Sequence, residues 1–335
     1  MEFKSFKRPT SKDVAKVAGV SRATVSAYIN KTRYVSPKLE EKIQSAINKL
    51  RYTPNELARS LKMQDTKTIG LIIPVLSDFF VPMLNIIDEI LQKNNYSLLL
   101  SSSEEDGKRE RKILEIFLSK QISGIIVVPS SEKNRMLIDQ IMINGTPIVQ
   151  VNRKIDKLDV DYIVSKNFDA IYKATEFLIK KGRKNIALLG YNVNVFGERE
   201  KKDGYEKAIN DNNLNINTIN INGRNPESIL ESLDDFFSPD KKIDGIICTS
   251  QMRTTLSLKY LKDKSIKIPK DMSFIGYEDT SLAILHNPPL TVISENIKDM
   301  GEKSANLLLK RIKNKGMIRT KKILLDFNFF IRESC

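Results

Sequence analysis

Cysteine and histidine are almost absent from the chain. Its 335 residues include two cysteines, Cys248 and Cys335, and a single histidine, His286. So few cysteines exclude a disulfide-stapled scaffold and fit a reducing compartment. One histidine and two distant cysteines also cannot supply the ligands of a zinc site. We therefore expect neither a metal nor a cofactor.

Long apolar runs are also missing. The longest, such as residues 69–76, extend over about eight residues, which is too short to span a bilayer. The first ten residues are polar and basic and lack the apolar core of a secretory signal. These absences predict a cytoplasmic protein without a membrane partner.

The motifs of common enzyme classes are absent as well. The sequence contains no Gly-x4-Gly-Lys phosphate loop, no Gly-x-Gly-x-x-Gly after the first β-rich run and no His-Glu-x-x-His metal motif. His286 stands in the run Leu-His-Asn-Pro-Pro, which is typical of a loop. The sequence therefore predicts that the protein is not an enzyme.

Positive charge, in contrast, is abundant and unevenly placed. The formal net charge is +14, and residues 1–67 contain fifteen Lys or Arg and six Asp or Glu, a net charge of +9. One fifth of the chain thus carries most of the excess, as expected for a domain that binds a polyanion. The alternative is a lysine-rich composition without a binding role.

Residues 10–62 show short helical patterns and no strand-like run. Thr10 and Asp13 form a capping-box pattern that starts a helix over residues 11–18, and Gly19 is suited to end it. The residues expected on its core face are Val14, Val17 and Ala18.

Two further helices follow. Ser21 is suited to cap a helix over residues 22–29, and Pro37 opens a third helix that extends to about Arg51. The inward residues expected on these helices are Val25, Ile29, Leu39, Ile43, Ala46, Ile47 and Leu50. Two short helices joined by a tight turn that contains Gly predict a helix-turn-helix, whose second helix enters the major groove of DNA.

From residue 68 onward, β-rich runs alternate with helical segments. The runs lie at 69–74, 97–100, 124–128, 147–151, 186–190, 244–248 and 272–276. Near-continuous Ile, Val and Leu runs of this kind indicate parallel strands that helices cover on both faces. The spacing recurs loosely in two halves, which predicts two similar, doubly wound α/β lobes.

Six segments carry the pattern of a known family. They are residues 10–30 (TSKDVAKVAGVSRATVSAYIN), 34–36 (YVS), 52–61 (YTPNELARSL), 67–74 (KTIGLIIP), 276–279 (GYED) and 288–291 (PPLT). They closely resemble the lactose-repressor (LacI/GalR) family of transcriptional regulators, and the resemblance covers essentially the whole chain. It implies a small all-α helix-turn-helix head followed by a two-lobed α/β domain like that of periplasmic sugar-binding proteins. It also implies a homodimeric repressor that binds a pseudo-palindromic operator in double-stranded DNA and responds to a small-molecule effector.

The resemblance also implies a division of the chain. Residues 1–53 are expected to form the DNA-binding domain, 54–67 a hinge helix and linker, and 68–335 the effector-binding and dimerisation domain. Within the last, the N-lobe would comprise about 68–165 and 294–323, and the C-lobe about 166–293 and 324–335.

By this resemblance, Arg22 and Ala23 face base edges, and Arg22 could make a bidentate contact to guanine. The alternative for Arg22 is a solvated surface charge. The residues matching positions that contact the DNA backbone are Thr10, Thr24, Ser26, Asn30 and Ser36, and Ser11 belongs to the same surface. Where the family usually has an arginine this chain has Ala27, so we expect a different operator preference.

Residues 55–61 match the hinge helix of the family, with Asn55 at its start. There Leu61, beside Ala58, is the wedge inserted into the minor groove, which unstacks a base step and bends the DNA. Such a wedge requires a dimer on a two-fold site. The alternative places Leu61 on the core face of a helix packed on the effector domain.

Twelve residues match positions that line the family's effector cleft. They are Ser77, Asp78, Phe80, Ser102, Ser103, Ser130, Asn152, Lys166, Lys201, Asn225, Gln251 and Glu295. Several depart from the pattern: Asn152, Lys166 and Gln251 stand where the family usually has Asp, Lys201 where it has Arg, Asn225 where an aromatic is common and Glu295 where Gln is usual.

These departures argue against an ordinary neutral sugar, because three carboxylates and the arginine fork that bind sugar hydroxyls are replaced. Lys166, Lys201, Arg153 and Arg199 could instead suit an anionic ligand such as a phosphorylated sugar. Another small molecule, or no small ligand at all, are the alternatives.

Two other functions remain open at this stage. The chain could be a periplasmic-type solute-binding protein, although its basic head argues against this. It could also be a regulator that responds to a protein corepressor, which the sequence does not separate from a ligand-controlled repressor.

Overall fold

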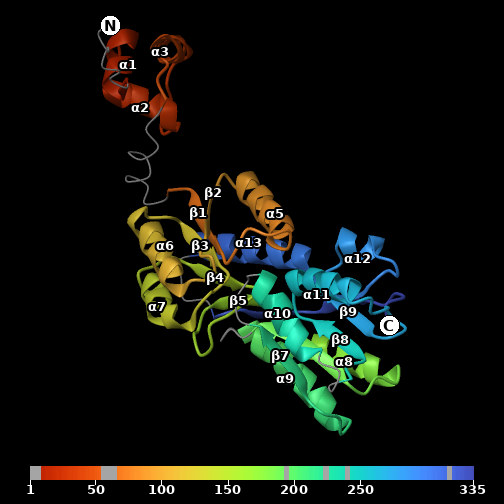
Figure 1. The fold of residues 1–335 in the computed structure, drawn as a ribbon. Helices are drawn as coiled ribbons and strands as arrows, with labels where there is room; N and C mark the ends of the chain where they lie inside the picture. Colours follow the sequence, from red (N-terminus) through yellow and green to blue (C-terminus); the bar gives the residue numbers. More distant parts are fainter. Residues whose placement is uncertain (1–8, 54–65, 192–195, 222–225, 238–241, 315–318) are drawn as a thin grey trace. The chain divides into compact units, whose positions relative to one another are not determined.

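The computed structural model describes residues 9–53, 66–191, 196–221, 226–237, 242–314 and 319–335. The chain divides into two compact units, Met1–Thr66 and Lys67–Cys335 (Figure 1). The first unit contains helices α1 to α3, and the second contains two sheets with their covering helices. Among these described residues, no helix is both long and apolar enough to cross a membrane.

The first helix, α1 (Ser11–Ala18), has the predicted boundaries and caps. The Thr10 backbone N–H donates to the Asp13 carboxylate over 2.8 Å, and the Asp13 N–H donates to the Thr10 hydroxyl over 3.4 Å. Both halves of the capping box are therefore present. Gly19 takes a left-handed conformation with φ of 66°, which ends the helix.

Helices α2 (Arg22–Asn30) and α3 (Pro37–Leu50) also match the predicted spans to within one residue. The Ser21 hydroxyl accepts a hydrogen bond from the Thr24 backbone N–H over 3.1 Å and so caps α2. The buried apolar residues of the head are Val14, Ala15, Ala18, Val25, Ala27, Val35, Ile43 and Ala46.

The prediction for Val17 is wrong, because its side chain is 45% exposed. Val17 and Ala15 lie at opposite edges of the apolar stripe of α1, and the neighbouring helices cover the Ala15 edge. Ile29, expected to face inward, is half-buried.

The second unit contains two six-stranded sheets, as the sequence predicts for paired doubly wound lobes. The N-lobe sheet has the order β11-β5-β4-β3-β1-β2 and is parallel throughout. Its strands are β1 (Thr68–Ile73), β2 (Ser97–Ser102), β3 (Gly124–Val127), β4 (Ile148–Val151), β5 (Asp161–Ser165) and β11 (Lys322–Leu325).

The C-lobe sheet has the order β12-β10-β9-β8-β6-β7, and β12 runs antiparallel to β10. Its strands are β6 (Ile186–Tyr191), β7 (Asn217–Ile221), β8 (Gly245–Cys248), β9 (Ser273–Tyr277), β10 (Thr291–Glu295) and β12 (Phe327–Phe330). The seven strands predicted from apolar runs are confirmed. The five that were missed (β5, β7, β10, β11 and β12) are broken by polar residues, as in Asn-Thr-Ile-Asn-Ile of β7.

Helices cover both faces of each sheet, which explains why central strands such as β3 and β8 are buried at every residue. The N-lobe helices are α5 (Phe80–Lys93) and α13 (Ile297–Lys313) on one face, and α6 (Gly107–Ser119) and α7 (Arg135–Ile143), preceded by the short η1 (Glu132–Asn134), on the other. The C-lobe helices are α8 (Asn167–Lys180) and α9 (Phe196–Asp211) on one face, and α10 (Pro226–Phe236), α11 (Gln251–Asp263) and the short α12 (Ser281–Leu285) on the other.

The chain passes between the lobes three times. The crossings join β5 to α8, β10 to α13 and β11 to β12. Because the carboxyl ends of parallel strands meet at one edge of a sheet, the first two crossings place Ser165 and Glu295 at the junction of the lobes.

Helices α8 and α9 approach closely at Gly204, and this contact supports a stability prediction. A Cβ atom at position 204 would overlap the carbonyl oxygen of Phe168 and lie 3.0 Å from its carbonyl carbon. Since backbone atoms cannot yield as a flexible side chain does, we expect Gly204→Ala to destabilise the chain by about 1–3 kcal/mol. Urea unfolding would measure this.

The adjacent exposed residue on the same helix, Asp203, offers a control. Asp203→Ala should leave the free energy of unfolding within about 0.5 kcal/mol of wild type. Equal stability of both variants would contradict the close packing of α8 on α9.

Candidate functional site

The exposed side of α2 in the head carries the residues expected to read DNA. Arg22, Ala23 and Ser26 are exposed, and Thr24 and Asn30 are half-buried. The Arg22 Nε atom donates to the hydroxyl of Ser11 on α1 over 3.2 Å. This contact orients the guanidinium from a neighbouring helix while leaving its terminal N–H groups available to an acceptor.

Local hydrogen bonds already hold several of the side chains expected to contact phosphates. The Thr24 and Ser21 hydroxyl oxygens lie 2.8 Å apart, and Asn30 Nδ2 donates to the Ser26 carbonyl over 2.8 Å and to its hydroxyl over 3.2 Å. The Thr10 hydroxyl donates to Asp13 over 2.7 Å. Ser36 precedes α3 but makes no side-chain capping bond there.

Two features of the head were not foreseen. Ala27 is 3% exposed and belongs to the core, so its methyl group does not form part of the exposed face of α2. Tyr34 is 85% exposed between α2 and α3, in a stretch that also exposes Lys31 and Arg33. An aromatic residue within a short basic connection was the available signal for Tyr34. Asn55, Ala58 and Leu61 of the expected hinge lie outside the described residues.

A cavity of about 530 Å³ lies between the two lobes of the second unit. The N-lobe residues that line it are Val75, Ser77, Asp78, Phe79, Phe80, Glu105, Asn152 and Arg153. The C-lobe residues are Asn167, Gly197, Glu198, Lys201, Thr249, Ser250, Gln251, Met252, Arg253, Thr255, Leu256, Tyr277, Glu278 and Glu295. We call this cavity the cleft.

Seven of the twelve residues expected in the cleft line it: Ser77, Asp78, Phe80, Asn152, Lys201, Gln251 and Glu295. Ser102, Ser103, Ser130 and Lys166 are not part of the lining, and Asn225 lies outside the described residues.

Ser103 and Ser130 have a structural environment instead. Their hydroxyl oxygens lie 2.6 Å apart in a buried contact. The Ser130 backbone N–H and Asn134 Nδ2 both donate to the buried carboxylate of Glu110 on α6, over 2.5 and 2.6 Å. Burial raises the pKa of Glu110, and these two donors oppose that shift. The cluster fixes the loop that follows β3. Ser102 is likewise engaged outside the cleft and donates to the Pro74 carbonyl over 3.1 Å.

The cations expected to hold an anionic ligand are all paired with carboxylates. Lys166 donates to Asp326 over 2.7 Å, and this contact raises the pKa of Lys166. Arg199 bridges Glu132 and Asp156 over 2.9 and 2.6 Å, outside the cleft lining.

Arg153 and Lys201, which do line the cleft, are paired in the same way. Arg153 forms a bidentate pair with Glu105 over 2.7 and 2.8 Å. Lys201 donates to Glu198 over 3.2 Å and to the Thr249 carbonyl over 3.1 Å, and it lies 4.1 Å from the centre of the Tyr277 ring. Carboxylates thus pair the four described cations that the sequence nominated for an anionic ligand, which weakens the sequence-based argument for a phosphorylated sugar.

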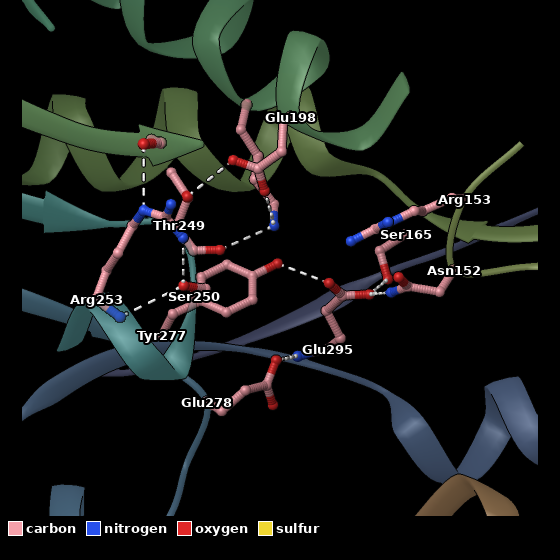
Figure 2. Close-up of polar contacts among 12 residues, drawn as sticks. Asn152, Arg153, Ser165, Glu198, Thr249, Ser250, Arg253, Tyr277, Glu278 and Glu295 are labelled. Atoms are coloured by element: carbon pink, nitrogen blue, oxygen red, sulfur yellow. Dashed lines mark hydrogen bonds and ion pairs between the residues drawn. The ribbon is translucent and has the colours of Figure 1, made fainter. Parts of the chain in front are cut away.

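Figure 2 shows a network of hydrogen bonds in which three residues contact Glu295, a residue of the cleft lining. The Tyr277 hydroxyl donates to Glu295 Oε1 over 2.7 Å, whereas Ser165 and Asn152 donate to Oε2 over 2.8 and 3.0 Å. Ser165 and Asn152 belong to the N-lobe, and Tyr277 belongs to the C-lobe. One carboxylate thus bonds to both lobes at the crossing between them.

Glu278 lies beside Glu295 and shares its environment. Its carboxylate accepts from the Ser294 hydroxyl over 2.9 Å and from the Glu295 backbone N–H over 3.2 Å. Burial, and then the charge of Glu295, raise the pKa of Glu278 to about 8. Glu105, Glu198 and Glu278 are cleft residues that the sequence reasoning missed. The motif Gly-Tyr-Glu-Asp was the signal for Glu278, whereas no local pattern marks the other two.

This arrangement can bind a small hydrogen-bonding molecule. Phe79 and Phe80 of the N-lobe pack edge to face with ring centres 4.8 Å apart, and Met252 and Leu256 of the C-lobe add further apolar surface to the lining. Carboxylates and amides on the remaining wall provide directional hydrogen bonds. Within the described ranges no group of three potential metal ligands occurs, and the Nδ1 atom of His286 lies 2.7 Å from the Pro288 carbonyl oxygen in its own loop.

A helix-turn-helix head and a two-lobed domain with a cavity between its lobes together define a ligand-responsive DNA-binding regulator. The matching family models agree. Residues 10–55 match the bacterial regulatory proteins of the lacI family, and residues 66–333 match the periplasmic binding proteins and sugar binding domain of the LacI family. The chain belongs to the LacI family and is a transcriptional regulator.

Relatives with the same architecture cover nearly the whole chain. It is 33% identical over 311 residues to the probable HTH-type transcriptional regulator EndR of Paenibacillus polymyxa, which covers 91% of each chain. It is 32% identical over 330 residues to the HTH-type transcriptional repressor PurR of Haemophilus influenzae, covering 97% of this chain and 98% of PurR. The Lac repressor dimer bound to operator and the anti-inducer ONPF has the same fold, with a TM-score of 0.84, 22% identity and coverage of 98% and 99%.

The raised pKa of Glu278 supports a prediction about stability. The folded chain holds a proton on Glu278 up to about pH 8, whereas an unperturbed Glu loses it near 4.5. The folded state therefore binds more protons in this window, and stability falls as pH rises through it, by up to about 1.4 kcal/mol per pH unit. We expect Glu278→Gln to reduce the fall in Tm between about pH 5.5 and pH 8.

Thermal unfolding of the wild type and the variant in matched buffers would measure this difference. Glu89→Gln removes a carboxylate that is exposed on α5 and should retain the pH profile of the wild type. If Glu278→Gln also followed the wild-type profile, Glu278 would not be the group that takes up the proton.

Proposed function

We propose that this regulator is a homodimeric repressor that recognises a pseudo-palindromic operator through two copies of α2 and is controlled by a ligand in the cleft. One observation carries this proposal above the others. The exposed face of α2 presents Arg22, and a hydrogen bond from another helix orients its guanidinium. An oriented guanidinium at the start of a recognition helix is suited to a bidentate contact with guanine.

The other side chains of the head would fix its register on the duplex. Ser11, Thr24, Ser26, Asn30 and Ser36 are hydroxyl- or amide-bearing residues suited to phosphate oxygens, with Thr10 at the N-terminus of α1 and Ala23 against a base edge. The net charge of +9 on residues 1–67 supports attraction to the DNA backbone.

We further propose the division of labour implied by the sequence. Residues 1–53 bind DNA, 54–67 form the hinge, and 68–335 bind the effector and dimerise. The exposed apolar side chains of Leu76, Leu282, Ile284 and Leu285 in the second unit support association with a second copy. The solved Lac repressor is a dimer on its operator, which is consistent with this assignment.

Ligand control would act through the lobe junction. A molecule that contacts both walls of the cleft favours the lobe arrangement it fits best, and so shifts the equilibrium between operator-binding and released forms. The matched charges of the cleft favour a neutral or cationic ligand over an anion. This departs from the phosphorylated sugar among the sequence-based alternatives.

The proposal excludes catalysis and places the protein in the cytoplasm with the DNA that it regulates. His286 is in a loop away from the cleft lining, and burial raises the pKa of Cys248 to about 12, so its thiol is not a ready nucleophile. A regulator that answers to a protein corepressor remains the second candidate, but the cleft between the lobes favours a small ligand.

Replacing Arg22 tests whether α2 recognises DNA bases. We expect Arg22→Ala to weaken binding to the preferred operator by about 1–3 kcal/mol and to relax preference at one base pair of each half-site. Operators selected from a random oligonucleotide pool, followed by fluorescence anisotropy at several salt concentrations, would measure both effects. Lys93→Ala, at an exposed cation in the other unit, is the matched control. Failure of the wild type to select any sequence would overturn the proposed function.

Leu61 is the residue proposed to wedge into the minor groove. We expect Leu61→Ala to reduce the bend of the bound operator, because the smaller side chain unstacks the central base step less. Gel mobility with circularly permuted operator fragments would report the bend angle. An unchanged angle in the variant would assign Leu61 to packing within the protein instead.

A further inference from the structure

Among the described residues that line the cleft, carboxylates outnumber cations. The acidic residues are Asp78, Glu105, Glu198, Glu278 and Glu295, and the cations are Arg153, Lys201 and Arg253. A cavity with this balance repels an anionic ligand and attracts a cationic one. The question is which carboxylates remain available.

Other groups of the chain already bond to the three cations and to two of the carboxylates. Arg153 pairs with Glu105 and Lys201 pairs with Glu198, as described above. Arg253 is 5% exposed and donates to the Gly190 carbonyl over 3.1 Å and to the Ser250 hydroxyl over 3.0 Å.

Glu278 and Glu295 are the unusual pair. They are 8% and 6% exposed, yet among the described residues neither has a Lys or Arg nitrogen within 4.0 Å. Burying two neighbouring carboxylates without a cation is costly, so such a site either retains a proton or receives a positive charge. The pair can therefore hold a proton, which the positive charge of a ligand can replace.

The two carboxylates differ in what they can still accept. The three donors around Glu295 come from Tyr277, Ser165 and Asn152, and they occupy both of its oxygens. Glu278 receives one donor on each oxygen, from Ser294 and from the Glu295 backbone. A carboxylate has about four lone-pair sites, so Glu278 retains acceptor capacity. Glu278 is also part of the cavity lining.

We propose that the effector carries a protonated amine, which donates hydrogen bonds to Glu278 while Glu295 adds a second negative charge behind it. This specification rests on the proposed function, because it concerns the ligand of the same cleft. The remainder of the effector would pack against the apolar side chains of Phe79, Phe80 and Leu256 in the cleft lining. An amine on an aliphatic, aromatic or sugar body has both properties.

A metal cation fits this position less well. Calcium and magnesium take six or more oxygen ligands, usually from several carboxylates. In the parts of the chain that the structure describes, no three His, Cys, Asp or Glu residues are grouped to hold a metal ion. An ammonium needs only two or three acceptors, which suits a pair of carboxylates.

Proton release should accompany binding of an amine. The charged and titratable groups that face the pair are Lys201 and Glu198 of α9, Arg253 of α11, Tyr277 of β9 and Arg153 after β4. Burial and the charge of Glu295 outweigh the opposing effect of Lys201 and raise the pKa of Glu278 to about 8, so Glu278 keeps a proton at neutral pH. An ammonium beside Glu278 lowers that pKa again, so up to about one proton leaves when the ligand binds.

Matched ligand sets test the proposal on the full-length chain. Each set offers one body in three forms: hexylamine, hexanol and hexyl phosphate; 6-amino-6-deoxyglucose, glucose and glucose 6-phosphate; phenethylamine, 2-phenylethanol and phenethyl phosphate. Thermal shift at about pH 7 ranks them, and titration calorimetry measures affinity. We expect an amine to bind at least about tenfold more tightly than its neutral counterpart.

Variants assign the preference to the carboxyl pair. Glu278→Gln should reduce the amine-to-neutral affinity ratio several-fold, to what Glu295 alone supports, whereas Glu89→Gln on α5 should preserve it. If Glu278→Gln does not fold, calorimetry of the wild type in buffers of different ionisation enthalpy still counts the protons released.

The outcomes separate this inference from the proposed function. Strongest binding by a neutral or phosphate member, no binding by any member, or binding of the amine without proton release would each overturn the inference. Operator selection on the same sample tests the proposed function independently. A chain that selects an operator but ignores amines retains its function and loses only this ligand assignment.

Discussion

The carboxylate of Glu295 is the constraint on which the junction of the two lobes depends. It accepts hydrogen bonds from Asn152 and Ser165 of the N-lobe and from Tyr277 of the C-lobe. A side chain that is 6% exposed and bonded to both lobes cannot keep all of its partners if the lobes separate. Because β10 leads directly into a crossing between the lobes, the same residue connects the geometry of the cleft to the path of the chain. Any ligand next to Glu295 therefore acts on the junction itself.

Charge is organised differently in the two units, and the difference follows their tasks. In the cleft, Arg153 and Lys201 are matched by Glu105 and Glu198, since an unpaired charge in a buried wall would cost free energy. Residues 1–67 instead carry a net charge of +9. Such a positive charge can neutralise DNA phosphates and release the counterions bound to them. Most of the +14 net charge of the chain therefore lies in residues 1–67 rather than in residues 68–335.

Sequence reasoning recovered the parts of the molecule whose determinants are local. Caps and apolar periodicity predicted both ends of α1 correctly, and continuous Ile, Val and Leu runs located seven strands. Strands such as β7, in which Asn and Thr alternate with Ile, lack that signal. The resemblance to the family correctly placed seven residues in the cleft lining. It could not predict their ion pairs, because these depend on contacts between residues far apart in the sequence. Lys166 is adjacent in sequence to the lining residue Asn167, yet its side chain pairs with Asp326, 160 residues away. The charge of the ligand site could not be inferred without those partners.

The choice of Glu rather than the Gln expected from the family resemblance has a physical explanation in this network. A Gln side chain presents one acceptor oxygen and one donor nitrogen, whereas an ionised carboxylate presents two acceptors. The side chains around Glu295 all donate to it: a phenol, a hydroxyl and an amide N–H. An amide nitrogen placed toward Tyr277 or toward Ser165 would leave one donor facing another unless the hydroxyl rotated away. The environment therefore favours a side chain with two acceptor oxygens at position 295. The carboxylate of Glu295, which joins the two lobes, is thus also a group that a ligand in the cleft can recognise.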